Sequence, residues 1–434
     1  MRTRGRVGVQ RGFALVEALV ATALVVGLVA GIYGLLDSSS RLAKQETSVA
    51  EAQQSVRAGI GELVRIVRQA RAGQLFYASA ILPEANNVPG GRSITDTAGA
   101  RHFIRQGTDA LRVRGVLFGD EYALTSGDVT CSGGCDGTSL MTITIRATAN
   151  SGVVNYASGS LPTLASKARP FFFVIADSAS QTVTVGSSIY LVPLYYVGRV
   201  EAAGTWYTRT ADTFTFTMNP QDPAARGLNA TTSGSPALQK PFLSGAVDDV
   251  VLFVDEGPTD ASGNARDTHP VLSAAISDPS SGAFEISPLV GEVEDFQVAY
   301  GIDGADGSIP DRGISASAVD VASPNADEWV GDVAGEVETM LPVSTSGITQ
   351  VQGFIDRSIS SGPPNPSLAT PALRSIWLSL VVKSAEPDAR YRGPGASGIR
   401  TLDSTAVSFS SPSVTGQAYR RRMQSFSVAM RNYQ

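Results

Sequence analysis

Apolar residues form one unbroken run near the start of the chain. Residues 13–36 contain a single charged residue, Glu17. As a helix this run would be about 36 Å long, more than the hydrocarbon core of a bilayer, which is about 30 Å thick. The pattern therefore predicts a membrane-spanning helix.

Beyond residue 36 the apolar positions become periodic, recurring every three or four residues as on one helix face. They are Val49, Ala52, Val56, Ile60, Leu63, Val67 and Ala70. No proline occurs before Pro83. We expect a single helix that is lipid-facing over residues 13–36 and amphipathic over residues 37–73. A membrane anchor followed by an unrelated stalk is the simpler alternative.

From residue 74 the chain changes to short apolar runs separated by Gly, Pro, Asn and Asp, which is typical of strands and turns. This predicts an α+β protein in which the helix packs on an antiparallel β-rich domain over residues 74–434, with large loop insertions. An inserted subdomain at about residues 220–290 and loops at about residues 305–370 are expected. Candidate strands are 110–118, 140–147, 170–176, 189–197, 213–218, 249–254, 296–300, 376–382 and 426–431.

The first twelve residues contain four arginines and no acidic residue. Positive charge ahead of an apolar helix keeps that end in the cytoplasm, so the bulk of the chain should be exported. An ordinary secretory signal would have a shorter apolar core and a small-residue cleavage site after it. Residues 37–40 offer no clear site of this kind. Signal cleavage and an unprocessed single-span anchor remain the competing interpretations.

Glu17 is the one charged residue within the predicted membrane helix, and its presence there requires an explanation. A carboxylate within a membrane helix costs about 2.5–3.5 kcal/mol, so it needs a partner or access to water. An interfacial glutamate that reaches water is the simpler interpretation. Alternatively, cleavage between Gly12 and Phe13 would create a free amine at the depth of Glu17 on a neighbouring subunit. A buried ion pair of this kind is favourable only when both charges are present.

Residues 11–17, Arg-Gly-Phe-Ala-Leu-Val-Glu, resemble the prepilin peptidase site of type IV pilins and type II secretion pseudopilins. The resemblance implies cleavage after Gly12, N-methylation of Phe13, and a requirement for Glu17 in assembly. Ala14 stands where the family more commonly has Thr or Ser. Residues 1–12 would then be a basic leader peptide.

Four later stretches resemble the PilW-like group of minor pilins. They are residues 107–114, residues 195–197 with 206–209, residues 293–303, and residues 420–432. The resemblance implies a minor pilin that starts in the bacterial inner membrane and then reaches the periplasm and the cell-surface pilus. There it would help to initiate assembly in a priming or tip complex. The implied partners are other minor and major pilins, the prepilin peptidase and methylase, the inner-membrane assembly platform and a large tip adhesin.

Two other functions compete with a minor pilin. A type II secretion pseudopilin would use the same N-terminal chemistry, and an adhesin or ligand-binding module could carry a pilin anchor. DNA uptake through a basic C-terminal patch is not favoured, because a net charge of −6 argues against nucleic-acid binding.

Charge is distributed unevenly along the exported part. Residues 241–340 contain 20 Asp and Glu against two arginines, whereas residues 374–431 contain nine Lys and Arg against three acids. Solvated surface and internal pairing are the simpler explanation. The sharper hypothesis is that one patch, including Arg420–Arg422, orients the subunit against a partner.

The two cysteines, Cys131 and Cys135, are too few to form a four-ligand zinc site. They predict a local disulfide in an oxidising compartment, with unlinked thiols as the alternative. Asp303, Asp306 and Asp311 lie on a Gly-rich turn that could offer oxygen ligands to calcium. The spacing is not that of an EF-hand loop, so an acidic turn without metal is favoured and no cofactor is expected.

The sequence shows no catalytic set. The two histidines, His102 and His269, lie far apart, and there is no Walker-type loop. We therefore expect a protein that is processed by enzymes and is not an enzyme itself.

Overall fold

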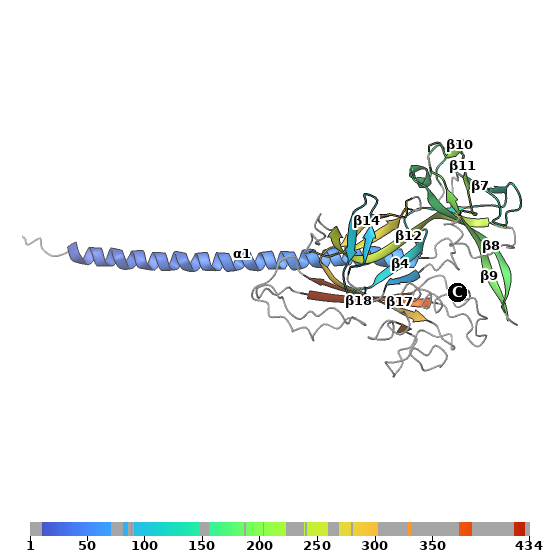
Figure 1. Ribbon diagram of the computed structural model, residues 1–434. Helices are drawn as coiled ribbons and strands as arrows, with labels where there is room; N and C mark the ends of the chain where they lie inside the picture. Colours follow the sequence, from blue (N-terminus) through green and yellow to red (C-terminus); the bar gives the residue numbers. More distant parts are fainter. Residues whose placement is uncertain are drawn as a thin grey trace, which may run out of the picture. The chain divides into compact units, whose positions relative to one another are not determined.

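The structure, a computed structural model, describes most of the chain in two compact units, Met1–Gln54 and Ser55–Gln434. The first unit holds most of a long helix, and the second holds the end of that helix and the strands (Figure 1). The described residues are 11–70, 81–85, 88, 91–147, 156–185, 188–202, 204–222, 238, 241–258, 269–278, 281–302, 329–330, 373–383 and 421–429.

Helix α1 (Arg11–Gln69) has different surroundings in the two units. In the first unit its apolar side chains are exposed, for example Leu24 at 69% and Leu35 at 71%. In the second unit Leu63, Ile66 and Val67 are at most 1% exposed. The predicted apolar stripe is therefore buried over the last turns of α1. Burying a large apolar side chain contributes about 1.5–3 kcal/mol, so a few such residues can hold this part of the helix on the sheets.

At Gly59, α1 lies in close contact with β14 (Phe284–Val290). A Cβ atom placed there would overlap Cγ2 of Val290, lie 3.1 Å from Cβ of Val290 and lie 3.2 Å from the Leu289 carbonyl oxygen. Val290 is only 1% exposed and belongs to the core, so it has little room to move. The absence of a side chain at Gly59 is therefore a packing requirement.

We predict that Gly59→Ala destabilises the second unit by about 1–3 kcal/mol, the usual cost of overpacking a core. Gly61→Ala is the matched control, because nothing lies within 4 Å of its Cβ position. Alanine there should stabilise the helix by about 1 kcal/mol through helix propensity. Chemical denaturation of the detergent-solubilised chain measures both values, and equal effects of the two substitutions would contradict this account of Gly59.

All strand pairs in the three sheets are antiparallel, which confirms the α+β class. The strands are β1 (Ile81–Ala85), β2 (Ser93–Thr95), β3 (Arg101–Ile104), β4 (Ala110–Gly115), β5 (Glu121–Ala123), β6 (Val129–Cys131), β7 (Met141–Arg146), β8 (Phe171–Val185), β9 (Ser188–Val200), β10 (Tyr207–Arg209), β11 (Thr213–Met218), β12 (Pro241–Pro258), β13 (Val271–Ser277), β14 (Phe284–Val290), β15 (Val293–Ile302), β16 (Trp329–Val330), β17 (Leu373–Lys383) and β18 (Arg421–Ala429). A 3₁₀ turn, η1, spans Thr163–Ser166.

The largest sheet has the order β1-β4-β12-β13-β14, and β2, β3, β5, β8 and β9 join it through β12, β3 or β8. A second sheet has the order β16-β15-β17-β18. Apolar residues of α1, of β4, β12 and β13, and of β15 and β17 form one cluster, here called the first core. The end of α1 thus packs against both sheets.

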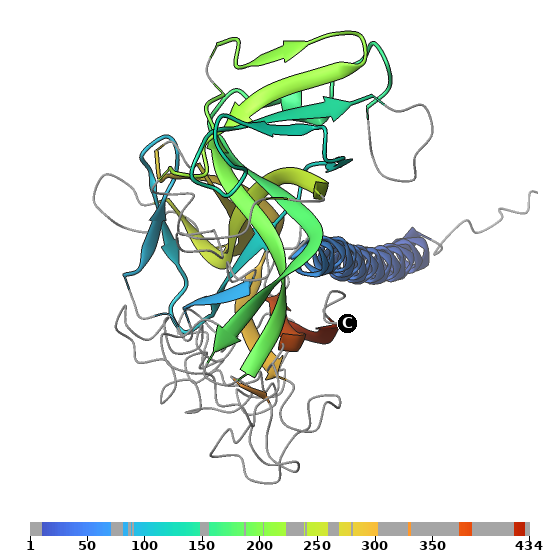
Figure 2. The ribbon, with the colours of Figure 1, turned by 90° about the vertical axis from the view of Figure 1, so that its right-hand side faces the viewer.

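A long segment is inserted between two neighbouring strands of the largest sheet. Gly115 of β4 pairs with Asp248 of β12, so a short turn could have joined them. Instead residues 116–247, here called the inserted module, lie between them in the chain. The module holds the third sheet, β10-β11-β7-β6, and the long β8–β9 hairpin, which Figure 2 shows in green.

The inserted module has its own hydrophobic cluster, here called the second core. Its described members come from β5 to β11, from Ala246 of β12 and from the adjoining loops, and none comes from α1. Trp206 makes edge-on contacts with Phe171, Phe214 and Phe216 at centroid distances of 5.4–5.7 Å. Aromatic pairs in this arrangement contribute about 0.5–1.5 kcal/mol beyond their burial.

The nine candidate strands all overlap strands of the structure, although several strands are longer than expected. The sequence pattern suggests an inserted subdomain at about residues 220–290. Within that range the described strands β12, β13 and β14 belong to the largest sheet. The loops expected at about residues 305–370 lie almost entirely outside the described residues.

Candidate functional site

The described part of the chain contains one helical stretch, Leu15–Lys44, that is long and apolar enough to cross a membrane. Side chains along this stretch are exposed within the first unit. The Thr22 hydroxyl donates to the Ala18 carbonyl at 2.7 Å, so its polar group is satisfied within the helix. Just beyond the apolar run, Asp37 and Arg41 form an exposed ion pair of 2.9 Å. These features are those of a membrane anchor.

Gly12 and Phe13 lie in the first turn of α1, and Glu17 follows one turn later. Residues four apart lie on one helix face, about 6 Å apart along the axis. Glu17 is exposed, and no described residue forms a hydrogen bond or ion pair with it. The Phe13 side chain is outside the part that the structure describes. The proposed roles of Gly12 and Phe13 therefore remain predictions from the sequence.

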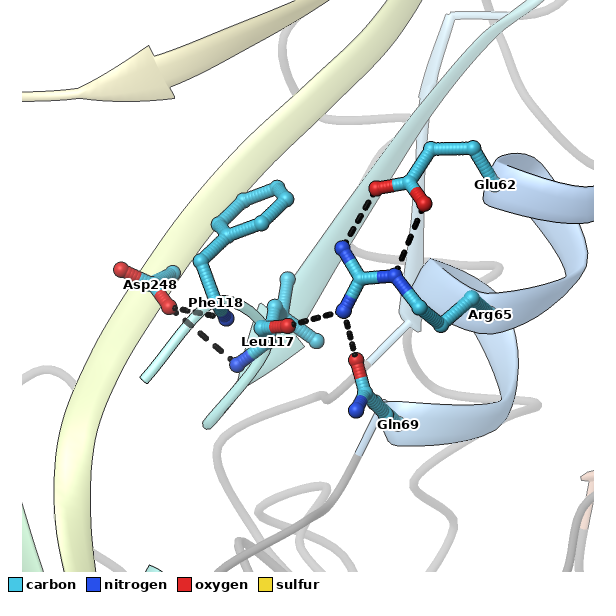
Figure 3. A network of polar contacts seen from close by, with 6 residues as sticks. All are labelled: Glu62, Arg65, Gln69, Leu117, Phe118 and Asp248. Carbon is cyan, nitrogen blue, oxygen red and sulfur yellow. Dashed lines mark hydrogen bonds and ion pairs between the residues drawn. The ribbon is translucent and has the colours of Figure 1, made fainter. Parts of the chain in front are cut away.

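Arg65 connects the last turns of α1 to the start of the inserted module (Figure 3). Its guanidinium binds both carboxylate oxygens of Glu62, donating from Nε to Oε2 at 2.8 Å. It also donates to Oε1 of Gln69 at 2.6 Å and to the Leu117 carbonyl at 2.7 Å. The guanidinium carbon lies 5.3 Å from the centroid of the Phe118 ring, within the range of a cation–π contact. The hydrogen bond from Arg65 lowers the pKa of Glu62.

We predict that Arg65→Met, which keeps the apolar stem and removes the guanidinium, lowers stability by about 1.5–3 kcal/mol, the range for hydrogen bonds to charged groups. The lower end is expected, because the side chain is 38% exposed and partly screened. Arg68→Met, at an exposed position of the same helix, should change stability by less than about 0.5 kcal/mol. Urea denaturation compares the two variants, and similar losses would argue against the Arg65 contacts.

Asp248 of β12 holds the same loop from its other side. Its Oδ2 accepts hydrogen bonds from the backbone N–H of Leu117 at 3.2 Å and of Phe118 at 2.9 Å. Lys167 Nζ lies 3.7 Å from Oδ1. Burial outweighs these contacts and raises the pKa of Asp248 above its ordinary value. The loop between β4 and β5 is thus fixed by a helix residue and by a strand residue.

The pKa of the next residue, Asp249, is shifted in the opposite direction. Arg112 binds it in a bidentate manner, with Nε at 2.7 Å and Nη2 at 2.8 Å, and Arg114 Nε lies 3.2 Å away. Burial opposes ionisation, but the two arginines outweigh it and hold the pKa of Asp249 below its ordinary value. Asp248 and Asp249 are adjacent on one strand, so their carboxylates lie on opposite faces. Their different surroundings therefore shift their pKa values in opposite directions.

Asp249→Asn should destabilise the domain by about 3 kcal/mol at neutral pH, because it leaves two half-buried arginines without their counter-charge. A lowered folded-state pKa gives stability that is present above the unfolded pKa of about 3.9 and is lost as pH falls through the folded pKa. The variant should therefore lose less stability than the wild type on acidification below about pH 4.

Melting temperatures between pH 3 and pH 7 measure this difference. Glu285→Gln, at an exposed position of β14, is the control and should follow the wild-type curve. If the melting temperature of Asp249→Asn fell with pH in parallel with that of the wild type, the lowered pKa of Asp249 would be contradicted.

The described acids of residues 241–302 are largely paired inside the domain. Most partners are basic residues between positions 102 and 169, and few come from the basic C-terminal region. The pairs are Asp248–Lys167, Asp249–Arg112, Asp249–Arg114, Asp255–His102, Glu256–Arg105, Asp278–Arg169, Glu292–His269 and Glu292–Lys383. Internal pairing therefore accounts for much of the described acidity. Arg420 and the side chains of Arg421 and Arg422 are outside the described part.

Cys131 and Cys135 form a disulfide with a Cα–Cα distance of 5.4 Å. Both lie against the second core, and the Cys135 carbonyl accepts a hydrogen bond from the Leu238 N–H at 2.8 Å. The disulfide therefore closes a loop of the inserted module.

The two histidines have different acidic partners. His102 contacts Asp255 through Nδ1 at 2.8 Å, and His269 contacts Glu292. Within the described ranges no group of three or more His, Cys, Asp or Glu side chains could hold a metal ion. Asp303, Asp306 and Asp311 lie outside those ranges, so the calcium turn is an untested prediction.

The contacts of Arg65 and Asp248 with the Leu117–Phe118 loop were not found from the sequence, since they join residues more than fifty positions apart. No protein-family model, curated protein or solved structure matches this chain.

Proposed function

We propose that this chain is a membrane-anchored subunit of a type IV pilus, of the PilW-like minor pilin kind. Prepilin peptidase would cleave after Gly12, and Phe13 would be N-methylated. The observation that carries the proposal is the position of Glu17 in the exposed, apolar stretch of α1, one turn after Phe13. A lone carboxylate there is tolerable when a neighbouring subunit supplies a positive charge at the same depth.

The β-rich second unit supports a structural role more than an enzymatic one. The ionisable groups described above pair with one another within the domain, and they hold strands and loops together. The end of α1 packs with strands of two sheets within the second unit. By resemblance, such a subunit would join other minor pilins in a priming or tip complex that starts filament growth.

A second candidate is an adhesin or ligand-binding module on a pilin anchor. The observation that favours it is the inserted module, which has a core and a sheet of its own. Deletion of the gene distinguishes the minor pilin from the adhesin. Lost piliation supports the assembly role, whereas normal piliation with lost surface binding supports the adhesin. A type II secretion pseudopilin would instead leave piliation intact and block secretion.

We predict that the mature protein begins with N-methylated Phe13, which mass spectrometry of its N-terminus would show. Glu17→Gln should be processed at Gly12 but lost from sheared filaments, because the neutral amide cannot pair with the amine. Glu46→Gln, on the same helix but outside the apolar stretch, should be incorporated normally. An intact Met1 on the membrane-inserted protein would falsify the proposal.

A further inference from the structure

The β8–β9 hairpin extends past the part of the largest sheet that holds it. β12 pairs with β8 no further than Asp177. A register shift between Ala176 and Ser180 follows, and beyond it residues 180–185 of β8 pair with residues 188–193 of β9. Figure 1 shows this outer part, here called the arm, continuing away from β12. Among the described strands, none but β8 and β9 takes part in its pairing.

An arm of two strands needs further support, because an isolated two-stranded ribbon is at most marginally stable in water. The natural place for a third strand is the edge of β8 that β12 covers up to Asp177, since β9 occupies the other edge. The chain ahead of β12 leads elsewhere, because the Leu238 N–H donates to the Cys135 carbonyl at 2.8 Å. Within the described part of the chain, this edge of the arm therefore has no strand beside it.

The two edges of the arm differ in sequence. Natural proteins keep sheet edges from pairing with proline and with charged residues, and the β9 edge contains Pro193. The β8 edge has neither, since no charged residue occurs between Asp177 and Arg199. Residues 180–185, Ser-Gln-Thr-Val-Thr-Val, contain no proline or glycine, and four of the six are β-branched. Short uncharged segments of this kind pair readily with identical copies of themselves.

We propose that residues 180–185 form an interface between two copies of this chain, in which the uncovered edges of the two β8 strands pair in antiparallel fashion. The two arms then become one sheet of four strands, above the three that independent stability requires. A two-fold axis gives both copies the same contacts. The occupant is a second copy, because a charged strand would find no counter-charge on the arm. The interface forms whether or not the chain is cleaved after Gly12.

Cysteine cross-linking tests this interface on the full-length chain in membranes. In an antiparallel pair of identical strands, the residue on the two-fold axis faces its own copy, with Cβ atoms about 4.5–5.5 Å apart. This separation is close to that of a disulfide. Single substitutions to cysteine at each position from 180 to 185 should therefore give, at one position or more, an oxidised species of twice the monomer mass. Thr217→Cys is the control, at an exposed position of β11 that pairs with Thr142 of β7.

Non-reducing gel electrophoresis, with mass spectrometry of the bands, gives the result. A monomer at every position of the segment, or equal cross-linking of Thr217→Cys, would overturn the interface. A cross-linked band that contains another protein would show that the occupant is not a second copy.

A charge swap tests the same pairing without a covalent bond. Lysine at Thr182 in both copies places like charges across the interface, which destabilises a cross-strand pair. Size-exclusion chromatography with light scattering of the detergent-solubilised chain should show a dimer for the wild type and for Thr217→Lys, and a monomer for Thr182→Lys. A mixture of Thr182→Lys and Thr182→Glu chains should recover the dimer, which also shows that the substituted chains are folded. A Thr182→Lys chain that stays dimeric, or a mixture that stays monomeric, would contradict the pairing.

Discussion

The second unit depends on the burial of one apolar face of α1 between two sheets. Leu63, Ile66 and Val67 are at most 1% exposed, and they belong to the first core together with residues of the largest sheet and of the β16-β15-β17-β18 sheet. Each sheet has an apolar face that must be buried from solvent, and the same helix packs against both faces. Gly59 lets the helix approach closely enough for this. Without the helix, the two sheets would lose the layer between them.

The pairing of β4 with β12 explains how a second core can be added without disturbing the first. The two strands are neighbours in register, so the chain leaves β4 at Gly115 and pairs with β4 again from Asp248 onward. Asp248 then binds the loop at the start of the module, and Arg65 binds it from the helix. A short stretch of β12 therefore belongs to both cores and fixes the junction between them.

The sequence was informative where the pattern is local. The apolar run predicted a helix long enough to span a membrane, and the spacing of Val56, Leu63 and Val67 predicted the buried helix face. Short apolar runs between turn residues predicted strands such as β7 and β11. Pairing between distant residues has no local signal. The position of the inserted module follows from the register of β4 and β12, and the partners of Arg65 and Asp249 follow from the folded arrangement. Neither the Gly59 contact nor these ion pairs could be predicted.

The disulfide constrains one of the two cores of the second unit. Cys131 and Cys135 lie against the second core, and neither belongs to the first. Reduction of the two thiols would therefore remove a covalent constraint from the second core only. Without an oxidant, the two cores of the second unit would differ in their resistance to proteolysis.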